Sequence, residues 1–130
     1  MGKMVTALAT MRPRTAMAVD AIFLLVFAAV GRRSHHEHDS VFGVLATALP
    51  FLIGAAAGWA VVRGWRAPRA ITPTGVSVWL GAVWIGMLLR ALTGQAVAWS
   101  FLLVASAVTA LFLLGWRLIV NTLVVVRSRG

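Results

Sequence analysis

The sequence predicts an all-helical integral membrane protein, with four transmembrane helices packed in one bundle. Of its 130 residues, 61% are hydrophobic and only 12% are charged, and the mean hydropathy is +0.93. Soluble domains are about half apolar, with about a quarter of their residues charged. Four apolar runs have lengths near that of a bilayer-spanning helix, and short polar, proline- or glycine-containing segments separate them. This length accommodates one small bundle and no soluble domain.

The first predicted helix covers about Thr15 to Gly31 and follows a lead, residues 1–14, that we expect to be loosely ordered. A bilayer core needs about 20 residues, so this helix should begin a little earlier or cross a thinned region. It contains Asp20, whose charge is costly at membrane depth and therefore commonly has a partner or a task.

The second predicted helix covers about Val41 to Val62 and contains two features that shape its packing. Pro50, near its middle, removes a backbone hydrogen bond and should kink the helix. The segment Gly54-Ala-Ala-Ala-Gly58 then places a small residue at every position. Such a face lets the backbone of another helix approach closely, so we expect Gly54 and Gly58 to pack against a neighbouring helix.

The third predicted helix covers about Val76 to Leu92, with Arg90 near its end, and a short Thr-Gly-Gln turn follows it. The fourth apolar run, Val97 to Val126, would be about 45 Å long if it were wholly helical. Because that exceeds the bilayer core, we expect residues 97–118 to span the membrane. The tail helix to residue 126 should tilt or lie at the interface, before a basic tail at residues 127–130.

The basic residues predict the orientation of the chain, because lysine and arginine in short loops favour the cytoplasm. The lead, the second loop and the C-terminal tail carry eight of them, whereas the first loop carries two. We therefore expect both termini to be cytoplasmic. The eight are Lys3, Arg12, Arg14, Arg63, Arg66, Arg69, Arg127 and Arg129. The two are Arg32 and Arg33.

The net charge of +9 should attract anionic lipid headgroups at the inner face rather than nucleic acid, because most of it flanks the apolar runs. Tryptophans agree with this orientation, since they favour membrane interfaces. Four fall towards the inner face, and Trp99 marks the outer one. The four are Trp59, Trp65, Trp79 and Trp116.

Helix geometry predicts that Asp20 and Arg117 meet. Asp20 is roughly 8 Å from the inner surface, and Arg117, about twenty residues down the fourth helix, reaches the same leaflet. Arg90 lies about 21 Å from the inner face, towards the outer leaflet. Two interpretations stay open: a structural Asp20 pair with both arginines snorkelling to their nearer interface, or a protonatable Asp20 in a transport pathway.

The outer loop, with Arg32, Arg33 and His35, contains residue types that bind metals. His35, His36 and His38 stand beside two acids, but they form no helical i, i+4 pair, and no fourth ligand is evident. We expect a solvated, pH-sensitive loop and no metal. The absence of cysteine excludes disulfides and thiolate catalysis, and no nucleotide-binding or hydrolase motif occurs, so we expect neither enzymatic activity nor a cofactor.

Several short motifs occur along the chain: Asp20 with Phe27, Gly31-Arg32-Arg33-Ser34-His35, Pro50-Phe51 with Gly54, Gly86-Met87 with Arg90, Ser100-Phe101, and Gly115-Trp116-Arg117. In this order, they resemble the motifs of domain-of-unknown-function family 3054 over about residues 17 to 118. The resemblance implies a small, uncharacterised multi-pass protein of a prokaryotic plasma membrane, and it implies no activity.

Three functional hypotheses follow. The first is a small transporter or permeation protein, acting alone or as a homo-oligomer, with Asp20 in the pathway. The second is a non-catalytic accessory protein that packs against a membrane partner complex through the Gly54–Gly58 face. The third is a lipid-handling protein that uses the basic second loop.

Overall fold

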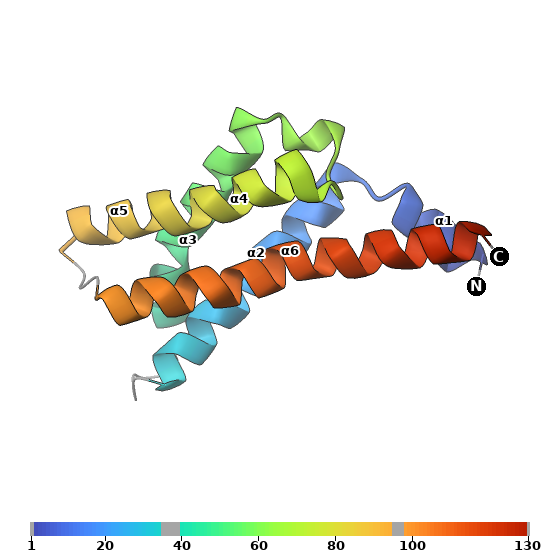
Figure 1. Cartoon of the computed structure of the whole chain (residues 1–130). Coiled ribbons are helices and arrows are strands. Elements are labelled where there is room, and N and C mark those ends of the chain that lie inside the picture. Colours follow the sequence, from blue (N-terminus) through green and yellow to red (C-terminus); the bar gives the residue numbers. More distant parts are fainter. Residues whose placement is uncertain (1, 35–39, 95–97, 130) are drawn as a thin grey trace.

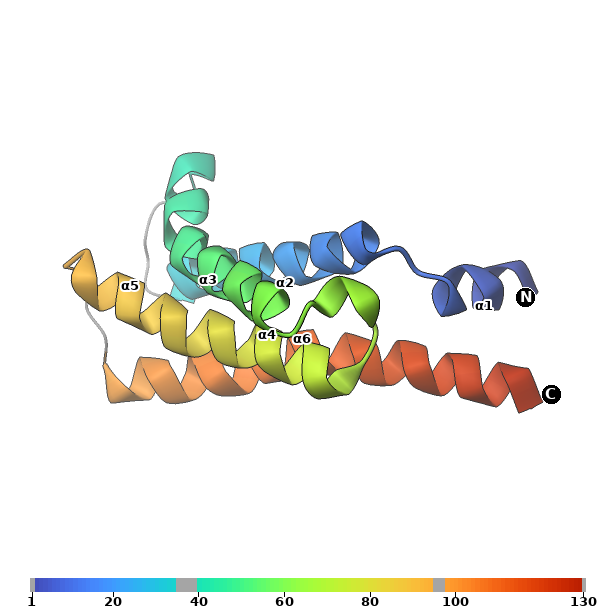
Figure 2. The same ribbon diagram turned by 90° about the horizontal axis from the view of Figure 1, so that it is seen from above.

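The computed structural model describes residues 2–34, 40–94 and 98–129, and its regular elements within these ranges are all helices (Figure 1). Four helical segments of this part of the chain are long and apolar enough to cross a membrane. They are Pro13–Arg32, Val41–Val61, Ile71–Leu92 and Trp99–Arg127. Both ends of the chain lie at the same end of the bundle (Figures 1 and 2). The expected four-helix class is therefore confirmed.

The expected loosely ordered lead is wrong, because it contains a helix, α1 (Gly2–Ala9), which packs beside the end of α6. The next helix, α2 (Pro13–Ser34), begins two residues before the expected start. The carbonyl of Arg12 accepts the Ala16 N–H, so Pro13 occupies the first helical position, where its missing N–H is not needed. With 22 residues, α2 is about 33 Å long and requires no thinned membrane.

Helix α3 (Val41–Val61) starts at a side-chain cap, since the Ser40 hydroxyl accepts the Gly43 N–H at 2.9 Å. Pro50 lies inside this helix, and Figure 2 shows α3 changing direction between its first and second halves, as expected of a proline kink. A residue in the left-handed conformation, Arg63 with φ of 51°, ends this span.

The third span consists of consecutive helical turns. After the short η1 (Gly64–Arg66), it runs through η2 (Ile71–Gly75), α4 (Val76–Leu80), η3 (Gly81–Ile85) and α5 (Gly86–Leu92). It therefore begins five residues before the expected Val76. The segment η3 has the wide turn of a π-helix, whereas η2 is interrupted at Thr72, whose backbone is extended.

The Gly54–Gly58 face of α3 packs directly on this third span. A Cβ atom at Gly54 would overlap the Gly81 carbonyl oxygen, and one at Gly58 would overlap that of Ser77. The Ser77 hydroxyl also donates to the Gly58 carbonyl at 2.8 Å. The predicted close packing is confirmed, but the idea that this face contacts a partner complex is wrong, because the chain's own third span covers it.

The last helix, α6 (Trp99–Arg129), is continuous for 31 residues. Its expected start at Val97 lies outside the described residues. The part beyond Arg117 extends the same rod, and together with α1 it projects past the ends of the other spans (Figures 1 and 2).

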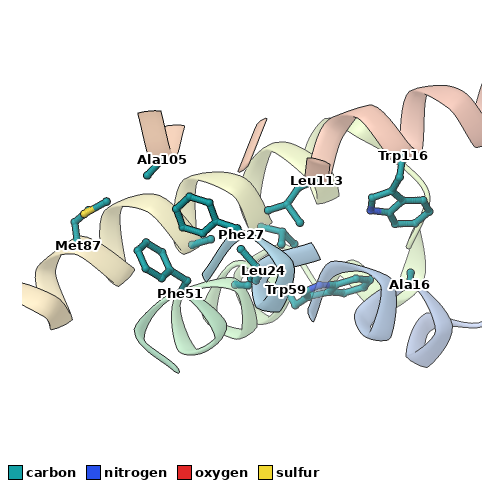
Figure 3. Packing of buried hydrophobic residues seen from close by; sticks show 12 residues of the cluster. Ala16, Leu24, Phe27, Phe51, Trp59, Met87, Ala105, Leu113 and Trp116 are labelled. Carbon is teal, nitrogen blue, oxygen red and sulfur yellow. The ribbon is translucent and has the colours of Figure 1, made fainter. Parts of the chain in front are cut away.

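The core of the bundle is aromatic at its middle. Phe27 of α2 meets Phe51 of α3 edge to face, with ring centroids 5.3 Å apart, and both rings lie near Phe101 of α6. Figure 3 shows Trp59 and Trp116 at one end of the buried cluster and Met87 at the other. The phenylalanines therefore separate two chemically different ends of the bundle.

Candidate functional site

Asp20 belongs to the buried stripe of α2. The residues of this stripe recur at the three- and four-residue spacing of one helix face, which turns Asp20 into the bundle with its apolar neighbours. They are Ala16, Asp20, Leu24, Phe27 and Ala28. Only 1% of the surface of Asp20 is exposed.

The carboxylate of Asp20 pairs with the guanidinium of Arg117, as the depths of the two residues predicted. Nη1 of Arg117 donates to Oδ1 at 2.9 Å, and Nη2 donates to Oδ2 at 2.8 Å. Two parallel hydrogen bonds of this kind are stronger and more directional than a single contact. The pair links α2 to α6 across the bundle.

Two tryptophans complete the hydrogen bonding of Asp20. The indole N–H of Trp59 donates to Oδ2 at 3.0 Å, and that of Trp116 donates to Oδ1 at 2.9 Å. Each carboxylate oxygen therefore accepts two hydrogen bonds. Both tryptophans lie near the expected end of the bundle, but they are buried rather than interfacial.

Arg117 is fully buried, so the expectation that it snorkels to the interface is wrong. Its Nη1 also donates to the Leu113 carbonyl at 2.8 Å, and its Nε donates to the Pro68 carbonyl at 3.1 Å. The guanidinium carbon lies 4.5 Å from the centroid of the Trp116 ring, which adds a cation–π attraction. These hydrogen bonds and the ring contact hold the buried cation in place.

We call this group of side chains the Asp20 cluster, and define it as Asp20, Trp59, Trp116 and Arg117. It joins α2, α3 and α6, and through the Pro68 carbonyl it also holds the second loop. Gly75 packs closely against the side chain of Arg117, since a Cβ atom at this position would lie 2.9 Å from the Cδ atom of Arg117. Sequence reasoning found the ion pair and missed the indole donors. The signal was available: an indole is a donor without an acceptor, and Trp116 adjoins Arg117.

A second polar connection ties the same loop to α6. Nη1 of Arg69 donates to the Asn121 side-chain oxygen at 2.5 Å, and the Asn121 amide donates to the Arg69 carbonyl at 3.0 Å. Arg69 also reaches the carbonyl of Ala9, the last residue of α1, at 3.5 Å. This arginine, which was expected to act as an orientation signal, therefore also has a structural role.

The structure does not bring Arg90 to Asp20. As predicted from its depth, Arg90 lies at the opposite end, in the last turn of α5, with its guanidinium carbon 4.8 Å from the centroid of the Phe101 ring. Arg32 and Arg33, which were expected in a loop, belong to the end of α2. The positive charge of Arg32 near a helix C-terminus is favoured by the helix dipole. Arg32 donates to the Thr47 hydroxyl at 3.0 Å. The proposed loop residue His35, with His36 and His38, lies outside the described residues.

An apolar groove of about 260 Å³ runs beside the Asp20 cluster, between α2 and α3. Its walls come from Met17, Ala21 and Leu24 on α2, with Asp20 at its floor. The opposite wall comes from α3, with Leu52, Ala56 and Ala60 among its residues.

A family model described as a protein of unknown function (DUF3054) matches residues 17–120. The chain belongs to this family. The match confirms the resemblance seen in the sequence motifs and spans both partners of the Asp20–Arg117 pair. The family description carries no activity. No curated protein and no solved structure matches the chain significantly.

Proposed function

We propose that this DUF3054 protein is a non-catalytic accessory membrane protein, in which the Asp20 cluster holds the helices together and moves no proton or solute. The observation that supports this proposal is the state of the Asp20 carboxylate, which is buried and accepts four hydrogen bonds. A proton or substrate would first have to displace Arg117 or an indole. Displacement of Arg117 leaves a buried charge unpaired, which costs about 3–5 kcal/mol, and displacement of an indole removes a hydrogen bond to a charged group, which costs about 1.5–3 kcal/mol.

The second candidate function is a small transporter, and one observation favours it. Asp20 and Trp59 both line the groove between α2 and α3, so a rotation of the Trp59 side chain would open a route from the groove to the carboxylate. In this candidate, Asp20 exchanges Arg117 for a proton or a cationic substrate during the cycle.

Flux measurements in sealed proteoliposomes separate the two candidates. We expect no protein-dependent solute flux under a pH gradient, for the wild type or for Asp20→Asn. The control is the double variant Asp20→Asn/Arg117→Gln, which lacks the carboxylate without leaving a buried charge. Wild-type flux that both variants abolish, while circular dichroism shows them folded, would contradict the accessory proposal and establish transport.

An accessory protein must also have a partner, which native gels can detect. We expect the protein in gently solubilised native membranes to migrate as part of an assembly larger than the purified protein in the same detergent. Identical migration of the two samples would contradict the proposal.

We infer that both termini are cytoplasmic, in a prokaryotic plasma membrane. The support is the distribution of basic residues, eight of which belong to the lead, the second loop and the tail. Because the chain has no cysteine, single cysteines at Ser40 and Ala70 can be labelled with an impermeant reagent. We expect labelling of intact cells at Ser40 alone. Labelling at Ala70 would show that the chain has the opposite orientation.

A further inference from the structure

We propose that the groove between α2 and α3 binds one acyl chain of an anionic phospholipid, whose phosphate is held by arginines at the end of the groove nearest the second loop. This inference goes beyond the accessory role and does not depend on it, because lipid binding requires no partner protein, although Asp20 and Trp59 of the Asp20 cluster also line the groove. It rests on the shape of the groove, the chemistry of its walls and the charges at one end.

The shape of the groove suits an extended hydrocarbon chain. On α3 the lining residues recur from Leu52 to Ala60, which corresponds to about 12 Å along the helix axis. On α2 the lining runs from Met17 to Leu24, so the groove follows both helices lengthwise. Alanines keep it open, because any larger side chain at their positions would fill the space. They are Ala21, Ala55, Ala56 and Ala60.

The walls of the groove are apolar, and its one acid does not change this. The carboxylate of Asp20, at the floor, is already neutralised by Arg117 and saturated by the two indoles. A polar solute entering the groove would lose its own hydration without gaining a hydrogen-bond partner, which is costly. A hydrocarbon chain loses nothing of this kind and fits the walls by van der Waals contact.

Three exposed arginines are close in sequence to the residues that line one end of the groove. Trp65 of η1, which is 46% exposed, closes the groove at the end near the second loop. Arg14 precedes the lining residue Met17 by three residues, Arg66 follows Trp65 directly, and Arg63 follows the lining residue Ala60 by three residues, between α3 and η1. All three arginines are exposed. Guanidinium groups bind phosphate oxygens through paired hydrogen bonds, and tryptophan favours the headgroup level. The site is therefore complementary to an anionic phospholipid.

Native mass spectrometry of the full chain tests this inference. The delipidated protein, in an uncharged detergent, is offered phosphatidylglycerol or phosphatidylcholine with identical acyl chains. We expect retention of a single phosphatidylglycerol per chain and much weaker retention of phosphatidylcholine. Equal retention of the two lipids would overturn the role of the arginines.

Variants of the groove sharpen the test. Ala56→Phe fills the groove and should abolish the retained lipid, whereas the control Leu111→Phe, on an exposed position of α6, should leave it unchanged. Arg63→Gln and Arg66→Gln should each weaken phosphatidylglycerol binding by about fivefold, the change that about 1 kcal/mol per basic residue near an anionic surface corresponds to. The arginine variants do not alter the bundle interior, so they keep the proposal testable if Ala56→Phe does not fold.

Two further results would overturn the proposal. The first is unchanged lipid retention in a folded Ala56→Phe variant, which would place the lipid elsewhere on the bundle. The second is displacement of the lipid by free inorganic phosphate, which would mean that the arginines bind an anion without any contribution from the groove.

Discussion

The interface between α3 and the third span and the interface between α2 and α6 are built in opposite ways. At the first, backbones touch: Gly54 and Gly58 face Gly81 and Ser77, and no Cβ fits between them. At the second, a buried aspartate meets a buried arginine, with two indoles completing the hydrogen bonds.

The difference shows two solutions to one problem. Between helices in lipid there is no hydrophobic driving force, so association depends on close packing or on hydrogen bonds. The small-residue interface tolerates no added atom, because its backbones are already in contact. The Asp20 cluster tolerates no lost group, because each loss leaves a charged or polar neighbour unpaired. The two interfaces should therefore respond to different kinds of substitution.

The largest effect is expected from Arg117→Gln, which removes the ion pair between α2 and α6. It leaves the Asp20 carboxylate buried without its counter-charge, and we expect the free energy of unfolding to fall by about 3–5 kcal/mol. Denaturant titration in detergent micelles measures this free energy of unfolding. The control Arg127→Gln, at an exposed position of the same helix, should change stability by less than about 0.5 kcal/mol. Similar losses in both variants would show that Arg117 has no buried partner.

A smaller loss is expected from Trp116→Phe, which keeps an aromatic ring but removes the indole N–H donor together with the five-membered part of the indole. Hydrogen bonds to charged groups contribute about 1.5–3 kcal/mol, so we expect a loss in that range. Trp84→Phe is the matched control, because Trp84 is exposed on the third span. If the two variants unfolded at the same denaturant concentration, Trp116 would be a packing residue only.

The small-residue interface should respond to added atoms, and alanine is the smallest addition. In Gly58→Ala, the new methyl group would overlap the Ser77 carbonyl, and overpacking of this kind costs about 1–3 kcal/mol. In the control Gly115→Ala, on α6, the methyl group meets open space. It should stabilise the protein by up to about 1 kcal/mol through higher helix propensity. A lower unfolding temperature for Gly58→Ala and a higher one for Gly115→Ala would support the comparison. An unchanged unfolding temperature for Gly58→Ala would contradict it.

Much of both interfaces could be predicted from the sequence, because their key features follow from counting residues. The GxxxG pattern of Gly54 and Gly58 is local, and small residues on a spanning helix favour close packing wherever the partner lies. The depths of Asp20 and Arg117 follow from the rise per residue of a helix. Which helix would cover the glycines could not be predicted, since several spans could have supplied a small-residue face.

The rest of the site depends on three-dimensional packing. A tryptophan near the end of a span suits either the interface or the core, so the directions of Trp59 and Trp116 required the structure. The carbonyls of Leu113 and Pro68 are backbone groups and have no signature in the sequence. Helix α1 was missed for a related reason: a helix of eight residues is marginal alone, and contact with α6 stabilises it.

The double-mutant cycle of Asp20→Asn and Arg117→Gln tests most directly whether the Asp20–Arg117 pair stabilises the helix bundle. Each single variant leaves one uncompensated buried charge, whereas the double variant leaves none. We therefore predict that the double variant loses less free energy of unfolding than the sum of the single losses, with a coupling energy of about 0.5–3 kcal/mol, as residues in contact show. Losses that add within experimental error would contradict the account, because they would show that the two side chains do not meet.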